Sequence, residues 1–142
     1  MMISSRGRYA LRVMIDLAEH QNDGFIPMKD VVGRQDVSQK YVEHIMVLLS
    51  KNGLVEGVHG KGGGYRLNRP PEAYRVGEIL RLTEGTLAPV ACLECGAKPC
   101  QRAAACRTLP MWSRLDHMIG EYLDSITIAD LMKQDGGDGY VI

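Results

Sequence analysis

Hydrophobic residues along the chain recur with a helical period in separate segments. In the first segment they fall at positions i, i+3, i+4 and i+7, namely Leu11, Met14, Ile15 and Ala18. This spacing predicts an amphipathic helix, which we expect to end near residues 22–24, where Asn-Asp-Gly stands. Pro27 opens a second, shorter helix over residues 28–34, in which Val31 and Val32 are the expected buried positions.

A third helix is predicted to begin after Ser38, because a serine hydroxyl at that position accepts a hydrogen bond from an unpaired backbone N–H group. We expect it to end at Asn52, where Gly53 follows. Its apolar stripe is expected to be Tyr41, Ile45, Leu48 and Leu49. Residues 54–58 and 65–67 have strand character and flank a glycine-rich loop, so they predict a β-hairpin.

The C-terminal half is predicted to be helical again. A short helix around Ile79 ends before Gly85, and a long helix follows, with Thr108 as its cap and Pro110 in its first turn. The apolar residues of the long helix are three and four positions apart, close to the seam of a coiled coil. They are Trp112, Leu115, Ile119, Tyr122 and Ile126. Thr127 with Asp130 resembles a capping box for a last helical turn.

Composition places the chain among ordinary globular proteins. Its 142 residues amount to about one domain, 45% of them are hydrophobic and 24% charged, and 17 basic residues balance 17 acidic ones. These values exclude disordered, collagen-like and disulfide-framework chains. The sequence has no apolar run of membrane-helix length and no signal-peptide pattern, so we expect a cytoplasmic protein without membrane contact, whose four cysteines are thiols.

Two short helices followed by a hairpin are the element order of a winged helix-turn-helix. In that motif the second helix enters the major groove of DNA and the hairpin forms the wing. Residues 1–70 carry ten basic and seven acidic side chains, a balance that is only weak evidence for a polyanionic partner. Each feature alone is more often an ordinary solvated surface, but their ordered combination favours DNA binding.

Side chains at the start of the third helix are predicted to reach base edges in the major groove. They are Ser38, Gln39, Lys40, Glu43 and His44. The Glu43 carboxylate is suited to accept a hydrogen bond from a cytosine amino group. Lys40 and Lys51 are expected to contact phosphates, which position a protein on DNA without specifying sequence.

The hairpin tip is predicted to contact DNA as well. His59 and Lys61 are placed to enter the minor groove. Gly62, Gly63 and Gly64 lack side chains, which would let the backbone approach a phosphate closely. A run of glycines in a hairpin is otherwise often only a turn.

All four cysteines fall within fifteen residues, in the spacing Cys92-x2-Cys95-x4-Cys100-x5-Cys106. Clustered thiolates select zinc or iron–sulfur centres. Zinc fingers usually separate two close pairs by a dozen or more residues, so this compact spacing suits a cluster better. A thiol redox switch without metal, a zinc site and an inert loop stay open as alternatives. No phosphate-binding loop and no nucleophile–base pairing stands out, so we predict no enzymatic activity.

Five segments resemble the Rrf2 family of bacterial winged helix-turn-helix transcription regulators. They are SRGRYAL at residues 5–11, YVE at 41–43, KNGLV at 51–55, GKGGGY at 60–65 and SITIADL at 125–131. The resemblance covers residues 2–133 and implies a homodimer, joined by the long C-terminal helix, on a near-palindromic operator. It implies that Ser38, Lys40, Tyr41, Glu43 and His44 lie on or beside the recognition face. His59 departs from the arginine that members often carry in the wing.

The resemblance also bears on the cysteines. Cluster-binding, IscR-like members hold iron through three cysteines of this loop, the last two spaced as Cys100 and Cys106 are, with Cys92 or Cys95 as the third. The family's histidine or carboxylate fourth ligand has no match here, because leucine and arginine occupy those positions. The resemblance thus implies an iron–sulfur cluster on four cysteines, 2Fe-2S with 4Fe-4S as the alternative, or with a carboxylate from the partner subunit. CymR-like members, which the first half and residues 140–142 also resemble, bind no cluster.

The leading hypothesis is a homodimeric repressor that senses iron–sulfur status, redox state or cysteine supply through the cysteine segment. Its predicted partners are double-stranded DNA and a second copy of the chain, and a regulatory partner enzyme stays unidentified. The alternatives are a cluster-free repressor of cysteine metabolism, and an electron-transfer or metal-handling protein whose winged helix makes only protein contacts. The predicted parts are a DNA-binding domain (1–86), a cysteine-bearing sensor loop (87–107), a dimerisation helix region (108–133) and a flexible tail (134–142).

Overall fold

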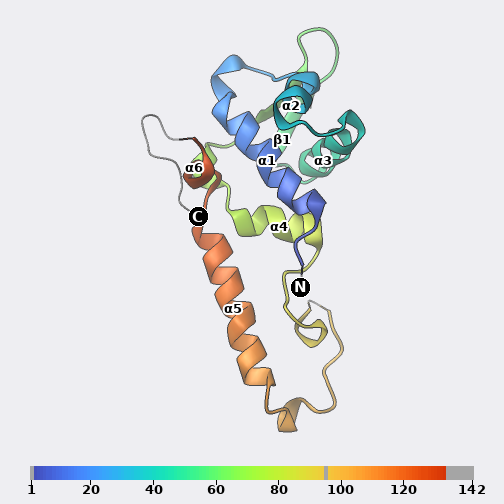
Figure 1. Cartoon of the computed structure of the whole chain (residues 1–142), viewed down its shortest axis with the longest axis vertical. Helices are drawn as coiled ribbons and strands as arrows, with labels where there is room; N and C mark the ends of the chain where they lie inside the picture. Colours follow the sequence, from blue (N-terminus) through green and yellow to red (C-terminus); the bar gives the residue numbers. More distant parts are fainter. Residues whose placement is uncertain (1, 95, 134–142) are drawn as a thin grey trace.

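The structure, a computed structural model, describes residues 2–94 and 96–133 and is mostly helical (Figure 1). Its helices are α1 (Ser5–Glu19), α2 (Met28–Gln35), α3 (Gln39–Lys51), α4 (Val76–Glu84), α5 (Leu109–Ser125) and α6 (Ile128–Leu131). An antiparallel hairpin pairs β1 (Val55–Val58) with β2 (Gly64–Leu67). Short 3-10 turns lie at Gln21–Asp23, Pro71–Ala73, Ala91–Leu93 and Ala103–Ala105. The predicted fold class is confirmed, and the tail predicted at 134–142 lies outside the described residues.

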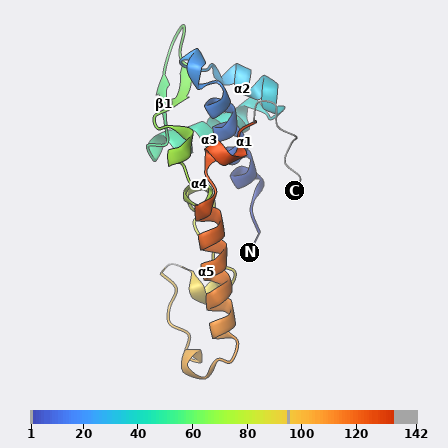
Figure 2. The same cartoon turned by 90° about the vertical axis from the view of Figure 1, so that its left-hand side faces the viewer.

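The elements gather at one end of an elongated molecule. Figures 1 and 2 show α1 to α4, the hairpin and α6 packed together, while α5 runs away from them. The segment that joins α4 to α5 turns back beside α5 in both views. Residues 87–107 are called the cysteine loop below.

The main core surrounds α1. Met14 and Leu17 of α1 are fully buried, together with Ile45 and Leu49 of α3 and Ile128 of α6. Burial of such side chains is the main favourable contribution to folding. Because Ile128 belongs to this core, the chain returns after α5 to close on the helices that precede it.

The predicted stripe of α1 is only partly right. Met14 and Ala18 are buried as expected, but Leu11 and Ile15 are half-buried. The positions that sequence reasoning missed are Ala10, Val13, Asp16 and Leu17. The reason is that α1 packs against α2, α3, α4 and α6, so its buried face is wider than one stripe.

The stripe of α3 is rotated in the same way. Ile45 and Leu49 are buried as predicted, whereas Tyr41 and Leu48 are only half-buried. Val42 and Met46 are buried instead, and together the buried positions follow i, i+3, i+4 and i+7. This rotation decides which side chains α3 presents to solvent.

The helix-turn-helix connection is tight and locally encoded. α2 ends at Asp36, whose backbone is left-handed (φ 53°), a conformation that aspartate tolerates better than most residues. Two residues later the Ser38 side chain accepts a hydrogen bond from the Tyr41 N–H at 3.3 Å, so the predicted cap is confirmed. The capping box of Thr127 and Asp130 at α6 is confirmed too.

The hairpin forms as predicted and is anchored by a third segment. Val55 pairs with Leu67 and Val58 with Gly64. In addition, Ile26 exchanges two backbone hydrogen bonds with Tyr65, at 2.8 and 2.9 Å. This bridge, which sequence reasoning missed, ties the base of the wing to the segment before α2.

α5 is attached to the rest of the described chain along one side. Ile119 and Leu123 of α5 pack with Val76 and Leu80 of α4 in a second, smaller core cluster. Ile126 also joins this cluster, but it lies just beyond the end of α5, so its predicted place inside the long helix is wrong. A β-type backbone at Ile126 ends the helix there.

Candidate DNA-binding surface and cysteine loop

One side of α3 carries exposed side chains along its whole length. Lys40, Glu43, His44 and Val47 are all exposed, and we call these four residues the outer row of α3. Ser38, Gln39 and Lys51 are exposed at the two ends of the helix, where sequence reasoning placed them. Gln39 donates a hydrogen bond to the Glu43 carboxylate at 3.3 Å, which orients this carboxylate on the helix surface. Val47, 53% exposed, was not among the predicted contact residues.

Tyr41 has a different place from its predicted neighbours on the recognition face. Its ring is half-buried and meets the ring of Tyr9 edge-on, with centroids 5.4 Å apart. The Arg12 guanidinium lies 5.0 Å from the Tyr9 centroid on the same patch. Such aromatic and cation–π contacts stabilise packing, so Tyr41 fixes the first turn of α3 against α1.

An ion pair between the buried Asp16 of α1 and the partly exposed Arg34 of α2 joins these two helices. The Asp16 side chain is 1% exposed and accepts hydrogen bonds from Arg34 Nε at 3.0 Å, Arg34 Nη2 at 2.8 Å and Gln35 Nε2 at 2.9 Å. The carboxylate beside it raises the pKa of the Arg34 guanidinium. Sequence reasoning missed this network; a single aspartate within the apolar face of α1 is the signal that could have indicated it.

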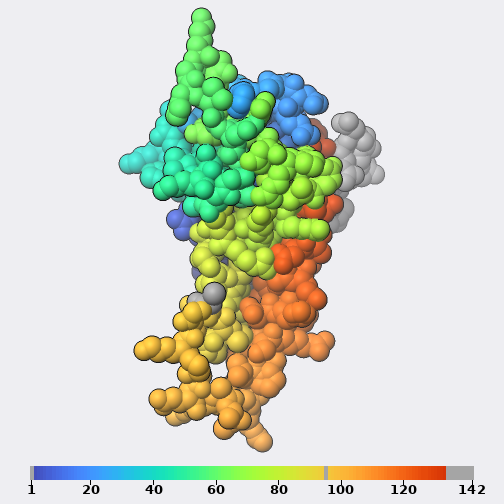
Figure 3. All heavy atoms as spheres, turned by 180° about the vertical axis from the view of Figure 1, so that it is seen from behind, coloured from blue at the N-terminus to red at the C-terminus, as the bar shows by residue number. Residues whose placement is uncertain are grey.

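The wing projects from the same end of the molecule as α3 and is prominent in the space-filling view (Figure 3). Its tip exposes His59, Lys61 and Gly62, as expected for a surface that meets DNA. Gly63 and Gly64 have structural roles that the sequence did not indicate, because a Cβ would collide with the carbonyl oxygen of Val58 at Gly63 and of Ile26 at Gly64.

A groove of about 540 Å³ separates the outer side of α3 from the wing. Glu43, Val47 and Ser50 of α3 line one side, and Val58 and His59 of the hairpin line another. The groove therefore lies between the exposed side of α3 and the hairpin.

The described cysteines lie in separate parts of the cysteine loop. Cys92 and Cys100 are exposed, Cys106 is partly exposed, and all three are free thiols. Within residues 2–94 and 96–133, no three histidine, cysteine or acidic side chains are gathered closely enough to hold a metal. The predicted four-cysteine site is thus not assembled among the described residues, and Cys95 lies outside them. A local reason is that Cys92 sits in one 3-10 turn and Cys106 follows another.

The sulfur of Cys106 lies among hydrogen-bond donors of the first residues of α5 and its cap. The Thr108 hydroxyl lies 3.5 Å from its sulfur, and hydrogen bonds from that hydroxyl and from the backbone N–H groups of Thr108 and Leu109 lower the pKa of the Cys106 thiol. A lower pKa increases the share of thiolate, the form that binds metals and reacts. Thr108 is the N-cap residue of α5, as predicted, but its side chain makes no capping hydrogen bond and its backbone is already helical.

One face of α5 carries four large apolar side chains that the described residues leave exposed. Met111, Leu115, Met118 and Tyr122, spaced i, i+4, i+7 and i+11, are 38–66% exposed. Leu115 and Tyr122 were predicted dimer residues, whereas Trp112 is partly exposed and Ile119 and Ile126 pack within the chain. The exposed apolar stripe of α5 is therefore rotated about the helix axis from the predicted dimer seam.

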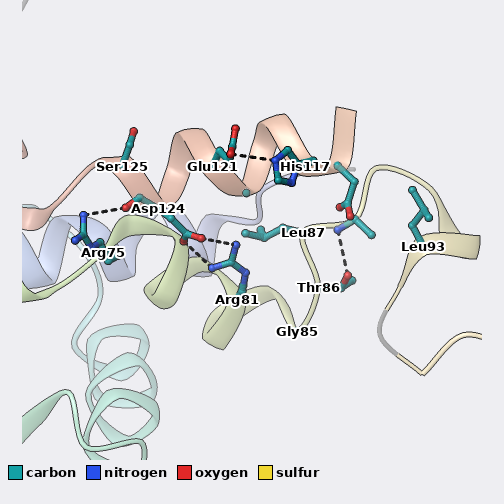
Figure 4. Close-up of a pocket in the computed structure, with 13 residues that line it drawn as sticks. Arg75, Arg81, Gly85, Thr86, Leu87, Leu93, His117, Glu121, Asp124 and Ser125 are labelled. Carbon is teal, nitrogen blue, oxygen red and sulfur yellow. Dashed lines mark hydrogen bonds and ion pairs between the residues drawn. The ribbon is translucent and has the colours of Figure 1, made fainter. Parts of the chain in front are cut away.

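A second groove, of about 920 Å³, runs between α4 and α5 (Figure 4). Arg81 and Asp124 form a two-pronged ion pair across it, at 2.7 and 3.1 Å, which lowers the pKa of the Asp124 carboxyl. Arg75 donates to the Asp124 carbonyl at 3.1 Å. Gly77 leaves room for this pair, since a Cβ there would collide with the Asp124 carboxylate.

The Rrf2 family, described as iron-dependent transcriptional regulator, matches residues 3–134. Among curated proteins, the HTH-type transcriptional regulator IscR of Erwinia tasmaniensis is 36% identical over 133 residues, which cover 94% of this chain and 79% of that protein. IscR of Yersinia enterocolitica is 37% identical over 133 residues, 94% of this chain and 80% of that protein.

None of the helices within the described ranges has the length and apolarity to cross a membrane.

Solved structures give the same relationship. CymR (YrzC), named as the global cysteine regulator of B. subtilis, matches with a TM-score of 0.75 and 35% identity over 92% of this chain and 95% of that one. IscR of T. potens matches with a TM-score of 0.70 and 34% identity over 92% and 85%. Relatives named as regulators agree with the prediction that the chain is not an enzyme. On this evidence the chain belongs to the Rrf2 family of DNA-binding transcriptional regulators.

Proposed function

We propose that this chain is a homodimeric repressor that binds a near-palindromic operator and responds to the state of its cysteine loop. The observation that carries the DNA-binding part is the outer row of α3, exposed beside a groove whose far side is the wing. A helix of this diameter fits a major groove about 12 Å wide. The wing then reaches the neighbouring minor groove of the same half-site.

Each contact residue has a distinct role in this proposal. The Glu43 carboxylate accepts a hydrogen bond from a cytosine amino group, and so specifies sequence. Lys40 and Lys51, at opposite ends of α3, pair with phosphates and set the register. His59 and Lys61, at the exposed tip of the wing, enter the minor groove.

The apolar face of α5 is the proposed dimer contact. Met111, Leu115, Met118 and Tyr122 repeat along one side of the helix, close to the spacing by which two helices pack. Pairing two copies through this face places two winged helices on one duplex. Half-sites of such dimers lie about 34–36 Å apart, or a multiple of that. A small change in the orientation of α5 relative to the winged helix therefore alters the spacing of the two recognition helices and the affinity for the operator.

The donor set of the cysteine loop fits an iron–sulfur cluster. Cys92, Cys100 and Cys106 belong to no disulfide, and the pKa of the Cys106 thiol is lowered. We propose that these three cysteines and Cys95 hold the cluster, of the 2Fe-2S type. Binding of the cluster to these thiolates would depend on the supply of iron and on redox state. The loop joins α4 to α5, whose mutual position Arg81 and Asp124 hold.

The proposal is tested with protein purified without oxygen. Iron, acid-labile sulfide and the visible spectrum report the cluster, and an operator is selected from a random duplex library. We expect salt-dependent binding to the selected duplex, with different affinities for cluster-loaded and cluster-free protein. Equal affinities would reject sensing and leave DNA binding intact, because a ligand shifts an equilibrium only by binding two states unequally.

A second candidate is a cluster-free thiol regulator, favoured by the separation of the described cysteines. It predicts colourless, iron-free protein whose operator affinity falls when Cys106 is oxidised and is restored by a thiol reductant. A third candidate, electron transfer, predicts a reversible redox couple together with no binding to any duplex. The proposed division into residues 1–86, 87–107 and 108–133 goes with the first two candidates.

A further inference from the structure

Val47 is an exposed apolar side chain in the outer row of α3, whose other members are polar. It is 53% exposed, although it lies on the same helix as the fully buried Val42 and Met46. It stands one turn after Glu43 and lines the same groove beneath the wing. Packing against the described residues therefore covers only about half of this branched aliphatic side chain.

The outer row of α3 has the spacing of a base-reading helix. Lys40, Glu43, His44 and Val47 fall at i, i+3, i+4 and i+7. Homeodomains read base edges in the major groove through four residues of one helix at this same spacing. Val47 occupies the last of these positions, where α3 faces the groove that the wing encloses.

The chemistry of an isopropyl group restricts what it could recognise in a major groove. It offers no hydrogen bond, and among base edges there only thymine presents an apolar group, its C5-methyl. We propose that Val47 is a specificity-determining residue that contacts the C5-methyl of one thymine in each half-site. This thymine lies adjacent to the base pair that Glu43 reads. This proposal rests on the proposed function.

Replacing single thymines by uracil tests the contact, because uracil pairs as thymine does and lacks only the methyl group. In a duplex selected for binding, we expect one thymine per half-site at which uracil lowers the affinity of the wild-type protein about fourfold, as for the loss of one buried methyl group. Val47→Ala should bind that duplex more weakly and lose its sensitivity to uracil there. Exposed helical valine tolerates alanine, the better helix former, and thermal melting checks the fold.

Val58 supplies the matched control, since it is also exposed (48%) and lines the groove from the wing side. Val58→Ala should keep the wild-type sensitivity to uracil. Operator binding with no uracil-sensitive thymine, or sensitivity that survives Val47→Ala, would overturn the inference and leave the proposed function standing. Failure of the wild-type protein to bind any duplex overturns both.

Discussion

The buried Asp16 carboxylate of α1 accepts hydrogen bonds from both Nε and Nη2 of Arg34. Arg34 stands near the end of α2, and its side chain is 37% exposed. The pair fixes the angle between the first two helices, and α3 follows α2 after a turn of three residues. The position of the proposed reading helix thus depends on one acidic residue in an otherwise apolar core.

Asp16→Ala should lower the free energy of unfolding by about 2 kcal/mol, since it removes hydrogen bonds to a charged group from a buried site. The loss stays below that of a fully buried pair because Arg34 can still reach water. Urea titration followed by circular dichroism measures it. Glu56→Ala, which breaks an exposed pair with Arg66, is the control and should cost less than about 1 kcal/mol. Equal losses in the two variants would show that Asp16 has no special role.

Two glycines should respond to alanine with opposite signs. Gly33 lies in the exposed middle of α2, and a Cβ there would meet nothing within 4 Å. Gly33→Ala should therefore raise the free energy of unfolding by about 0.5–1 kcal/mol. Gly64 has a φ of +152°, and a Cβ there would collide with the Ile26 carbonyl, so Gly64→Ala should lower it by about 1–3 kcal/mol. Thermal melts of both variants decide the signs, and a neutral Gly64→Ala would contradict a close approach of Gly64 to the Ile26 carbonyl.

Local chemistry made the ends of elements predictable from sequence. Ser38 caps α3, the Thr127–Asp130 box opens α6, and the glycine-rich tip makes a hairpin, because each depends on residues close in the chain. Thr108 occupies the predicted cap position of α5, but its hydroxyl lies near Cys106 and makes no capping hydrogen bond.

Tertiary packing was beyond the reach of periodicity. On α1, α3 and α5 the predicted apolar stripe is rotated about the helix axis from the observed one. The reason is that a period gives the spacing of buried residues and not the direction in which neighbouring helices lie. On α3 the exposed Val47 belonged neither to the predicted apolar stripe nor to the predicted contact residues. On α5 the rotation merged two faces, so Ile119, which packs on α4, was grouped with the exposed Leu115.

The ion pair between Arg81 and Asp124 should make stability depend on pH in acid. Because Arg81 holds the pKa of Asp124 below its ordinary value of 3.8, the pair contributes fully above that value, and its contribution is lost as pH falls through the lower, folded-state pKa. Both side chains are almost half exposed, so the contribution stays below about 1 kcal/mol and falls with added salt. The difference in unfolding free energy between wild type and Asp124→Asn measures it; the gap should be constant from pH 7 to about 5 and narrow below 3.8. A gap that widens in acid would contradict the assignment.

Removing the Glu43 carboxylate should relax sequence preference. In Glu43→Ala, discrimination at one base pair of each half-site should fall by about 1–3 kcal/mol. Binding to unrelated duplex should stay the same or strengthen, because a negative charge is removed from the DNA-facing side. Competition between the selected operator and single-base variants measures both effects. Glu121→Ala, which removes an exposed carboxylate from α5, should leave the preference unchanged. Unaltered discrimination in Glu43→Ala would reject a base contact.

A charge placed in the apolar face of α5 should separate the proposed dimer. Leu115 is 38% exposed in the single chain, so Leu115→Glu leaves the fold intact while placing a carboxylate from each copy in the proposed contact. Loss of a central apolar contact raises the dissociation constant at least about 30-fold, by the usual 2 kcal/mol of a hot spot. Sedimentation equilibrium measures it. Ser113→Glu adds the same charge about 160° around the helix from Leu115, at 100° per residue, and should leave the dimer unchanged. Operator affinity should fall in parallel for Leu115→Glu alone, because a single winged helix holds only one half-site. If Leu115→Glu stays dimeric while Ser113→Glu dissociates, the two copies meet through the polar side of α5 instead.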